Sequence, residues 1–151
     1  MFRSLIVLVG ALVAWGCASA PKAGPELQAR AMTFQPPPGA SRIYVVRPEG
    51  FMGAAVPLEV VVDSMFVGKL TPGTFVMTDV VPGDHVVACP SGESRAMLPL
   101  RTEPDSVYFL KLVPQWGAVI ASATLESLPP DEGRRWVRET EMVRRQELQD
   151  E

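Results

Sequence analysis

Histidine is nearly absent from this chain of 151 residues, in which His85 is the only one. Its isolation excludes a metal site with two or more histidine ligands. The sequence also lacks the G-x-S-x-G motif of a nucleophile elbow and the Gly-Lys-Ser/Thr ending of a phosphate-binding loop. Clusters of Lys and Arg are missing, and the formal net charge is −3, which disfavours nucleic acid as a partner. We therefore expect no metal and no cofactor, and an enzyme is the least favoured class of function.

A long hydrophobic run is missing as well. After Arg3, residues 5–15 are uncharged and apolar apart from one glycine, which is the pattern of a signal peptide. These 11 residues fall short of the roughly 20 that a membrane-spanning helix needs. We predict that residues 1–16 are a signal peptide and not a transmembrane anchor.

Cys17 closes this stretch and is the predicted lipidation site. The small residues of Ala14-Trp15-Gly16-Cys17 resemble the lipobox of bacterial lipoproteins, in which cleavage occurs before a cysteine that carries diacylglycerol. Two or three acyl chains on one residue suffice for stable anchoring. The alternative is secretory cleavage after Ala18-Ser19-Ala20, which would release a soluble protein, but Pro21 is unfavourable just past a scissile bond. By resemblance to other lipoproteins, Ala18 rather than Asp after the cysteine favours the outer membrane, facing the periplasm.

The mature chain of 135 residues is long enough for one domain. Cys89 is the only cysteine left beside a lipidated Cys17, which excludes an intramolecular disulfide, and we interpret it as a small buried residue of a strand. Residues 17–39 contain five prolines and few large apolar side chains, so we predict a disordered N-terminal tether. As a flexible coil of about 22 residues it would span roughly 28 Å.

Residues 40–128 contain short β-branched runs, separated by turn signals at the eight- to twelve-residue spacing typical of an all-β sandwich or barrel. We predict a mainly β fold: a single antiparallel β-sandwich of about seven or eight strands, followed by a C-terminal α-helix over 129–151. In that helix, Asp131/Arg135 and Glu141/Arg145 have i, i+4 spacing. The expected strands are 42–47, 57–63, 66–70, 74–80, 85–89, 95–101, 107–113 and 119–125, with Pro99 restricting its strand to an edge or bulge.

Four segments carry a resemblance to a known family. They are Arg42-Ile43-Tyr44-Val45-Val46-Arg47-Pro48, Gly50-Phe51-Met52-Gly53-Ala54-Ala55, Val61-Val62-Asp63 with Val67-Gly68-Lys69-Leu70, and Val81-Pro82-Gly83-Asp84-His85. Over residues 40–128 the chain resembles an uncharacterised family of bacterial envelope lipoproteins, distantly similar to PEGA-type β-sandwich domains. The resemblance implies an Ig-like or PEGA-like sandwich and an envelope location, but no activity. Family members commonly have Asp-Gly where this chain has Asp63-Ser64, which leaves open whether the tight two-residue hairpin forms.

The candidate binding residues are Gly50, Phe51, Met52 and Gly53, which place large apolar groups in a glycine-rich loop, and Trp116 in a second aromatic-glycine turn. If the two loops lie at the same end of the sandwich, they form a lip for a glycan, peptide or lipid. The alternative is that Phe51 and Met52 fold back and cap the sandwich. We expect a non-catalytic lipoprotein that is attached to the membrane through Cys17 and binds an envelope protein, or alternatively a carbohydrate or peptidoglycan-binding module.

Overall fold

The computed structural model describes residues 21–50, 56–91, 94–116 and 121–144, and it confirms a mainly β, two-sheet sandwich with a helix near the C-terminus. Each of the eight expected strands is present. The elements are α1 (Pro25–Ala31), β1 (Ser41–Arg47), β2 (Leu58–Val62), β3 (Met65–Leu70), β4 (Thr74–Val80), β5 (Gly83–Ser91), β6 (Ser94–Thr102), β7 (Val107–Trp116), β8 (Ala121–Leu128), α2 (Pro130–Arg138) and β9 (Glu141–Met142).

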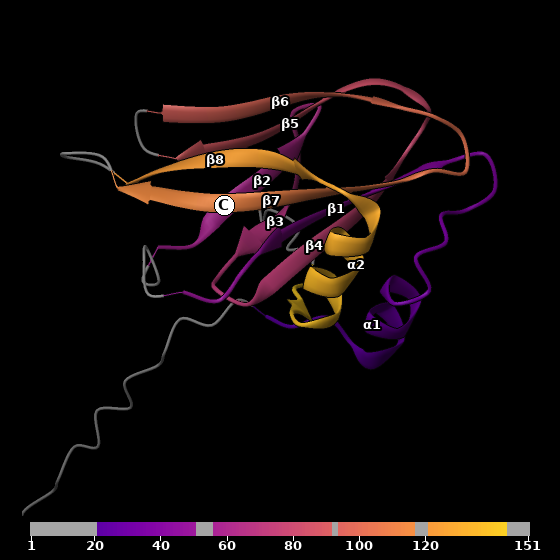
Figure 1. The fold of residues 1–151 in the computed structure, drawn as a ribbon, viewed down its shortest axis with the longest axis horizontal. Helices are drawn as coiled ribbons and strands as arrows, with labels where there is room; N and C mark the ends of the chain where they lie inside the picture. The colour runs from indigo at the N-terminus through magenta and orange to yellow at the C-terminus, as the bar shows by residue number, and fades with distance from the viewer. Residues whose placement is uncertain (1–20, 51–55, 92–93, 117–120, 145–151) are drawn as a thin grey trace, which may run out of the picture.

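The strands form a five-stranded sheet in the order β8-β7-β1-β4-β9 and a four-stranded sheet in the order β3-β2-β5-β6 (Figure 1). The expectation of a wholly antiparallel sandwich was wrong at two places, because β1 pairs with β7 and β4 pairs with β9 in parallel. Pro99 lies in β6, an edge strand, as its missing N–H requires.

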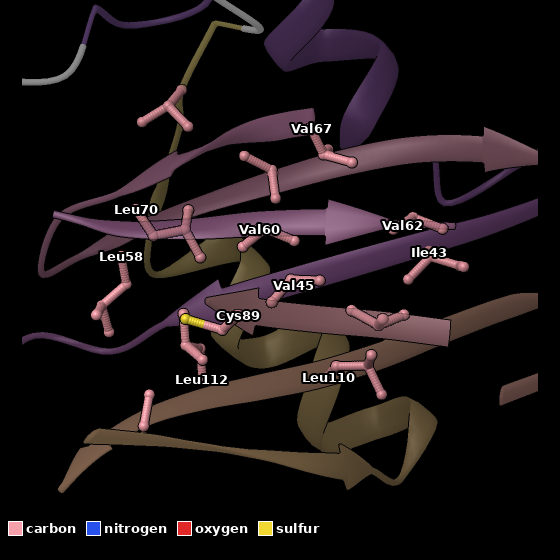
Figure 2. Close-up of a cluster of buried hydrophobic side chains, with 14 residues drawn as sticks. Ile43, Val45, Leu58, Val60, Val62, Val67, Leu70, Cys89, Leu110 and Leu112 are labelled. Atoms are coloured by element: carbon pink, nitrogen blue, oxygen red, sulfur yellow. The ribbon is translucent and has the colours of Figure 1, made fainter. Parts of the chain in front are cut away.

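The main core lies between the two sheets, where alternate side chains of each strand point inward (Figure 2). Val45, Val60 and Leu112 are among its fully buried members, and Cys89 occupies the buried strand position that the sequence predicts. The buried residues of this cluster are Ile43, Val45, Leu58, Val60, Val62, Val67, Leu70, Val76, Val87, Cys89, Leu110, Leu112, Ala123 and Val143.

A second core covers the opposite face of the five-stranded sheet, beneath α1 and α2. Tyr44 and Phe109 stack there with their ring centroids 5.1 Å apart. Gly133 allows α2 to approach Phe109 closely, because a β-carbon at this position would overlap Cβ and Cγ of that phenylalanine. The central strand β1 is therefore buried on both faces, and it carries apolar side chains in both directions.

The N-terminal tether was wrongly placed for residues 21–39, because α1 belongs to the domain. Ala31 is fully buried, and its carbonyl oxygen accepts a hydrogen bond of 2.6 Å from the Tyr44 hydroxyl. The backbone N–H of Ala23 donates to the carbonyl of Met142, and the N–H of Met142 donates to the side chain of Gln28. These tertiary contacts stabilise a helix of seven residues that would be marginal alone.

The C-terminal helix is shorter than expected. It ends at Arg138, the hydroxyl of Thr140 donates to the carbonyl of Trp136, and β9 follows. Val143, which follows β9, lies in the main core. Glu141 is in a strand, which rules out its expected helical pairing.

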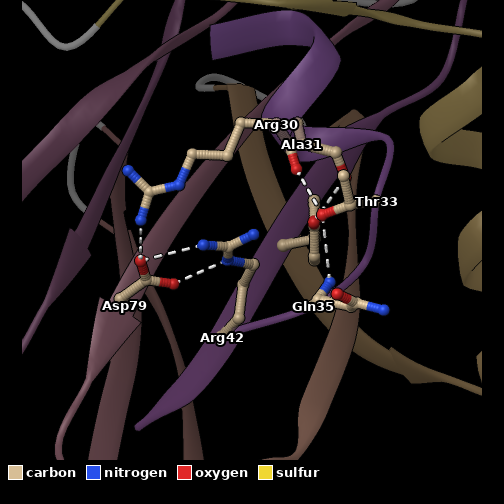
Figure 3. Close-up of polar contacts among 7 residues, drawn as sticks. Arg30, Ala31, Thr33, Gln35, Arg42 and Asp79 are labelled. Atoms are coloured by element: carbon tan, nitrogen blue, oxygen red, sulfur yellow. Dashed lines mark hydrogen bonds and ion pairs between the residues drawn. The ribbon is translucent and has the colours of Figure 1, made fainter. Parts of the chain in front are cut away.

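A buried ion pair fixes the start of β1 (Figure 3). Arg42 is fully buried, and its Nε and Nη2 donate to the Asp79 carboxylate at 2.6 and 3.0 Å. The exposed side chain of Arg30 in α1 reaches the same carboxylate at 3.3 Å. Hydrogen bonding to Asp79 is the largest cause that raises the pKa of Arg42, against the opposing effect of burial. In the described ranges, Nη1 of Arg42 is the one buried side-chain nitrogen or oxygen with no partner.

Candidate functional site

The outer face of the four-stranded sheet is solvent-facing and apolar. Because side chains alternate along a strand, residues between the inward positions of β2, β5 and β6 point away from the core. The pairing register places Val61, Ala88 and Met97 in one row across these strands, with Phe66 of β3 beside Val61. Among the described elements, no helix or strand covers this row. We call it the apolar row.

The apolar row forms the floor of a shallow groove of about 530 Å³. Met97 is the most exposed of its large side chains, at 57%. The lining residues are Val61, Asp63, Ser64, Val86, Ala88, Pro90, Arg95 and Met97. This combination of apolar floor and charged rim is typical of a binding surface.

Charged side chains flank the apolar row on both sides. Lys69 and Glu59 form a cross-strand ion pair at 3.2 Å on one side. Asp84 and Arg101 pair more loosely at 3.7 Å beyond the other side. Arg95 lies level with Pro90 and has no acidic partner among the residues that the structure describes.

His85 is buried behind Asp63, one of the lining residues, and both of its ring nitrogens have hydrogen-bond partners. Nδ1 is 2.5 Å from the Asp63 carboxylate and Nε2 is 2.7 Å from the carbonyl oxygen of Val81. Both partners accept hydrogen bonds, so the ring donates from both nitrogens as the charged imidazolium. Burial lowers the pKa of His85, but the hydrogen bonds to Asp63 and Val81 outweigh it and the net shift is upward. The hydrogen bond from His85, together with a second one from the Val86 N–H, lowers the pKa of Asp63.

Asp63 and Ser64 form the tight hairpin that the sequence left open. Both residues have positive φ, at 50° and 69°, which two-residue type I′ turns require. Asp63 tolerates this conformation better than most residues, and its carboxylate also accepts from the Val86 N–H at 2.9 Å. Contacts to β5 therefore hold a turn that lacks the usual glycine.

Gly50, the first residue of the predicted binding loop, lines a different, smaller pocket. Because β1 and β7 run parallel, the chain leaves both strands at the same end of the sandwich, so Gly50 and the backbone of Trp116 lie at that end. A pocket of about 200 Å³ opens there, lined by Gly50 with Arg47, Pro48, Glu49, Lys111, Leu112, Val113 and Pro114. Phe51, Met52 and Gly53 lie outside the described residues, as do Cys17 and the Trp116 side chain.

Arg47 lies beneath this end pocket and is almost fully buried. Its Nη1 donates to the carbonyl oxygens of Val56 and Leu70 at 2.8 and 2.9 Å, and burial lowers its pKa. Arg47, the last residue of β1, therefore holds two other parts of the chain in place: Val56, which follows the 51–55 segment, and Leu70, which ends β3.

Burial governs the chemistry of Cys89, the cysteine that the structure describes. Burial raises the pKa of Cys89 to about 11, so the thiol stays protonated at neutral pH. Within the described ranges, no group of three or more His, Cys, Asp or Glu side chains could hold a metal ion. No helix in those ranges has the length and apolar character needed to cross a bilayer.

The chain is similar to an uncharacterized protein of Haemophilus influenzae, at 27% identity over 144 residues, covering 95% of this chain and 85% of that protein. No protein-family model matches the chain. The search of solved structures also found no match.

The sequence reasoning missed the outer face, although a signal for it exists. Val60-Val61-Val62 and Val86-Val87-Ala88 are continuous apolar runs, which are typical of strands covered on both faces. In this fold only the inward half of each run is buried by the sandwich. The outward half is left only partly buried.

Proposed function

We propose that this protein is a bacterial envelope lipoprotein, anchored by lipid on Cys17, that displays a β-sandwich in the periplasm for binding or assembly without catalysis. In this proposal it belongs with the envelope lipoproteins that it resembles, and Ala18 directs it to the outer membrane. The observation that carries the binding role is the apolar row, with its groove and charged rim. A contiguous exposed apolar surface commonly marks an interaction site.

The position of Pro21 sets how near the membrane the domain would lie. The carbonyl of Pro21 accepts a hydrogen bond from the Arg144 N–H, and Lys22 pairs with Val143, so the domain begins at Pro21. Three residues lie between Cys17 and Pro21, and four extended Cα-to-Cα steps span at most about 14 Å. A lipid on Cys17 would therefore hold the sandwich against the membrane, about half as far away as a 22-residue coil would.

The groove chemistry favours a protein partner over a glycan. Sugars bind well where the face of an aromatic ring is free for stacking, and none of the described residues that line the groove is aromatic. Phe66, which lies beside Val61 at the β3 end of the apolar row, is outside that lining. Aliphatic side chains such as Val61, Val86 and Met97 suit apolar protein side chains. His85 is also unsuited to proton transfer with a substrate, because Asp63 and Val81 occupy both ring nitrogens.

Intact mass spectrometry of the protein from the membrane fraction tests the anchor. The proposal predicts a chain that begins at Cys17 and carries acyl groups, whereas ordinary secretory cleavage predicts an unmodified chain that begins at Pro21. Cys17→Ser should move the protein out of the membrane fraction. Equal membrane association of wild type and variant would contradict lipid anchoring.

Photo-crosslinking in cells tests the binding role. A photoreactive residue in place of Met97 should give a defined cross-linked band, and the same residue in place of the exposed Thr124 in β8 serves as the control. A Met97 variant that cross-links no more than the Thr124 control would remove the outer face from the proposal.

A further inference from the structure

We infer that the outer face binds a second copy of this chain, in a symmetric dimer whose two-fold axis runs parallel to β5 between the two faces. The inference rests on the proposed assembly role and names its partner. It follows from the order of strands in the sheet and from the charges that the pairing register places beside the apolar row.

The relevant side chains lie in two rows that cross β2, β5 and β6. The first is the apolar row, in which Val61 and Met97 lie on opposite sides of Ala88. The second row is two residues further along each strand. There Pro90 pairs with Arg95, and extending the β2–β5 register by two residues places Glu59 on the other side of Pro90.

Glu59 and Arg95 of one chain form no ion pair with each other in the described structure. One strand lies between them, and strands two apart in a sheet are separated by roughly 10 Å. Glu59 instead contacts Lys69, and Arg95 has no acidic partner in the part of the chain that the structure describes. The sheet thus presents an acid on β2 and a base on β6, at the same level and on opposite sides of β5.

A two-fold axis along β5 exchanges these positions. Rotation about it places β2 of one copy over β6 of the other, because the two strands flank β5 equally. Glu59 then faces Arg95 of the second copy, and Val61 faces Met97. The dimer therefore buries the apolar rows against each other and pairs opposite charges twice, which makes the face complementary to itself.

The same axis also brings one pair of like charges together. Asp84 also lies on β5, so the axis brings the two copies of Asp84 towards each other at the end of the strand. Each remains beside its own Arg101, 3.7 Å away. Lipid anchoring on Cys17 would further favour association, because confinement to a surface raises the effective concentration of the two copies.

Cross-linking at the axis tests the dimer. Ala88 lies on β5 and faces its own copy, with packed sheets about 10 Å apart. The full-length chain with Ala88→Cys, treated in membranes with a short bis-maleimide, should give a product of twice the monomer mass. Thr124→Cys, on the exposed side of β8, is the matched control and should stay monomeric.

Charge exchange in the Ala88→Cys background supplies the decisive comparison. Glu59→Arg alone and Arg95→Glu alone should each reduce the cross-linked fraction about tenfold, because each places like charges together twice in the dimer. The double variant Glu59→Arg/Arg95→Glu should recover most of the cross-linked fraction, because it restores opposite charges across the interface. Thermal melts of all variants verify that they remain folded.

The outcomes separate this inference from the proposed function. No cross-linking above the Thr124→Cys control, or no recovery in a folded double variant, overturns the dimer. A product that contains a different protein also overturns the dimer, but it leaves the binding role intact. Membrane association of the Cys17→Ser chain tests only the lipid anchor. Cross-linking of that chain in solution, through Ala88→Cys, still tests the dimer.

Discussion

The carboxylate of Asp63 and the imidazole of His85 join the β2–β3 hairpin to β5, with Oδ2 and Nδ1 2.5 Å apart. This contact combines a positive-φ turn, a buried ring and a half-exposed acid. It also lies beside the groove, since Asp63 is one of the lining residues. We therefore expect the titration of this pair to change the stability of the fold next to the candidate site.

The pair predicts a stability plateau at weakly acidic pH. The pKa of His85 is raised in the folded state, so its contribution is full below about pH 6.5 and is lost as the pH rises through the folded-state pKa. The pKa of Asp63 is lowered, so its contribution is present above about pH 4 and is lost as the pH falls through its folded-state value.

Thermal melts between pH 4 and pH 9 check this prediction. The melting temperature of the wild type should fall on the alkaline side of the plateau, and the difference between wild type and His85→Gln should be smaller at pH 9 than at pH 5.5. Glu126→Gln, an exposed change, should leave the wild-type profile unchanged. A constant difference between wild type and His85→Gln would contradict the assigned ion pair.

A second prediction concerns Gly133 in α2. Alanine is ordinarily about 1 kcal/mol better than glycine inside a helix. At Gly133, however, the new β-carbon would overlap Cβ and Cγ of Phe109, and the strand backbone limits how far Cβ can move. We expect Gly133→Ala to destabilise the protein by about 1–3 kcal/mol in urea unfolding. Gly50→Ala, with open space around the new atom, should change stability by less than about 0.5 kcal/mol.

The strands were predictable because their information is local. β1 and β8, for example, contain β-branched or alternating side chains between turn residues, and both lie within a few residues of the expected positions. α1 and β9 were missed because tertiary partners stabilise them. Ala31 is held by Tyr44, and β9 has only two residues and forms by pairing with β4. No local pattern reveals such partners.

The candidate site was predictable only in part. The sequence left open whether the two candidate loops lie at the same end of the sandwich. Gly50 and the backbone of Trp116 lie at one end because β1 pairs in parallel with β7, which no local signal encodes. The apolar row depends on which sheet each strand joins. Val61 and Met97 are 36 positions apart in the sequence, and only the intervening β5 places them in one row.

A third prediction tests the buried ion pair of Arg42 and Asp79. Asp79→Ala would leave a fully buried guanidinium without its carboxylate, which typically costs about 3–5 kcal/mol. Arg30→Ala removes only the ion pair between the exposed Arg30 side chain and Asp79, and it should cost less than about 1 kcal/mol. Chemical denaturation of both variants provides the comparison. Similar losses for the two would mean that Arg42 gains little from Asp79.

A fourth prediction uses the thiols to join the fold to the proposed anchor. Cys89 is fully buried and its raised pKa of about 11 keeps it protonated, so a maleimide should not label it at pH 7 in the folded protein. In denaturant Cys89 becomes accessible. If the sulfur of Cys17 carries lipid, the full chain from membranes should therefore show no reactive thiol when folded and one when unfolded.

An unmodified Cys17 would add a thiol in denaturant, and cleavage after Ala20 would remove Cys17 without adding lipid. Counting labels by mass distinguishes these forms, and labelling of Cys89 in the folded state would contradict its place in the main core.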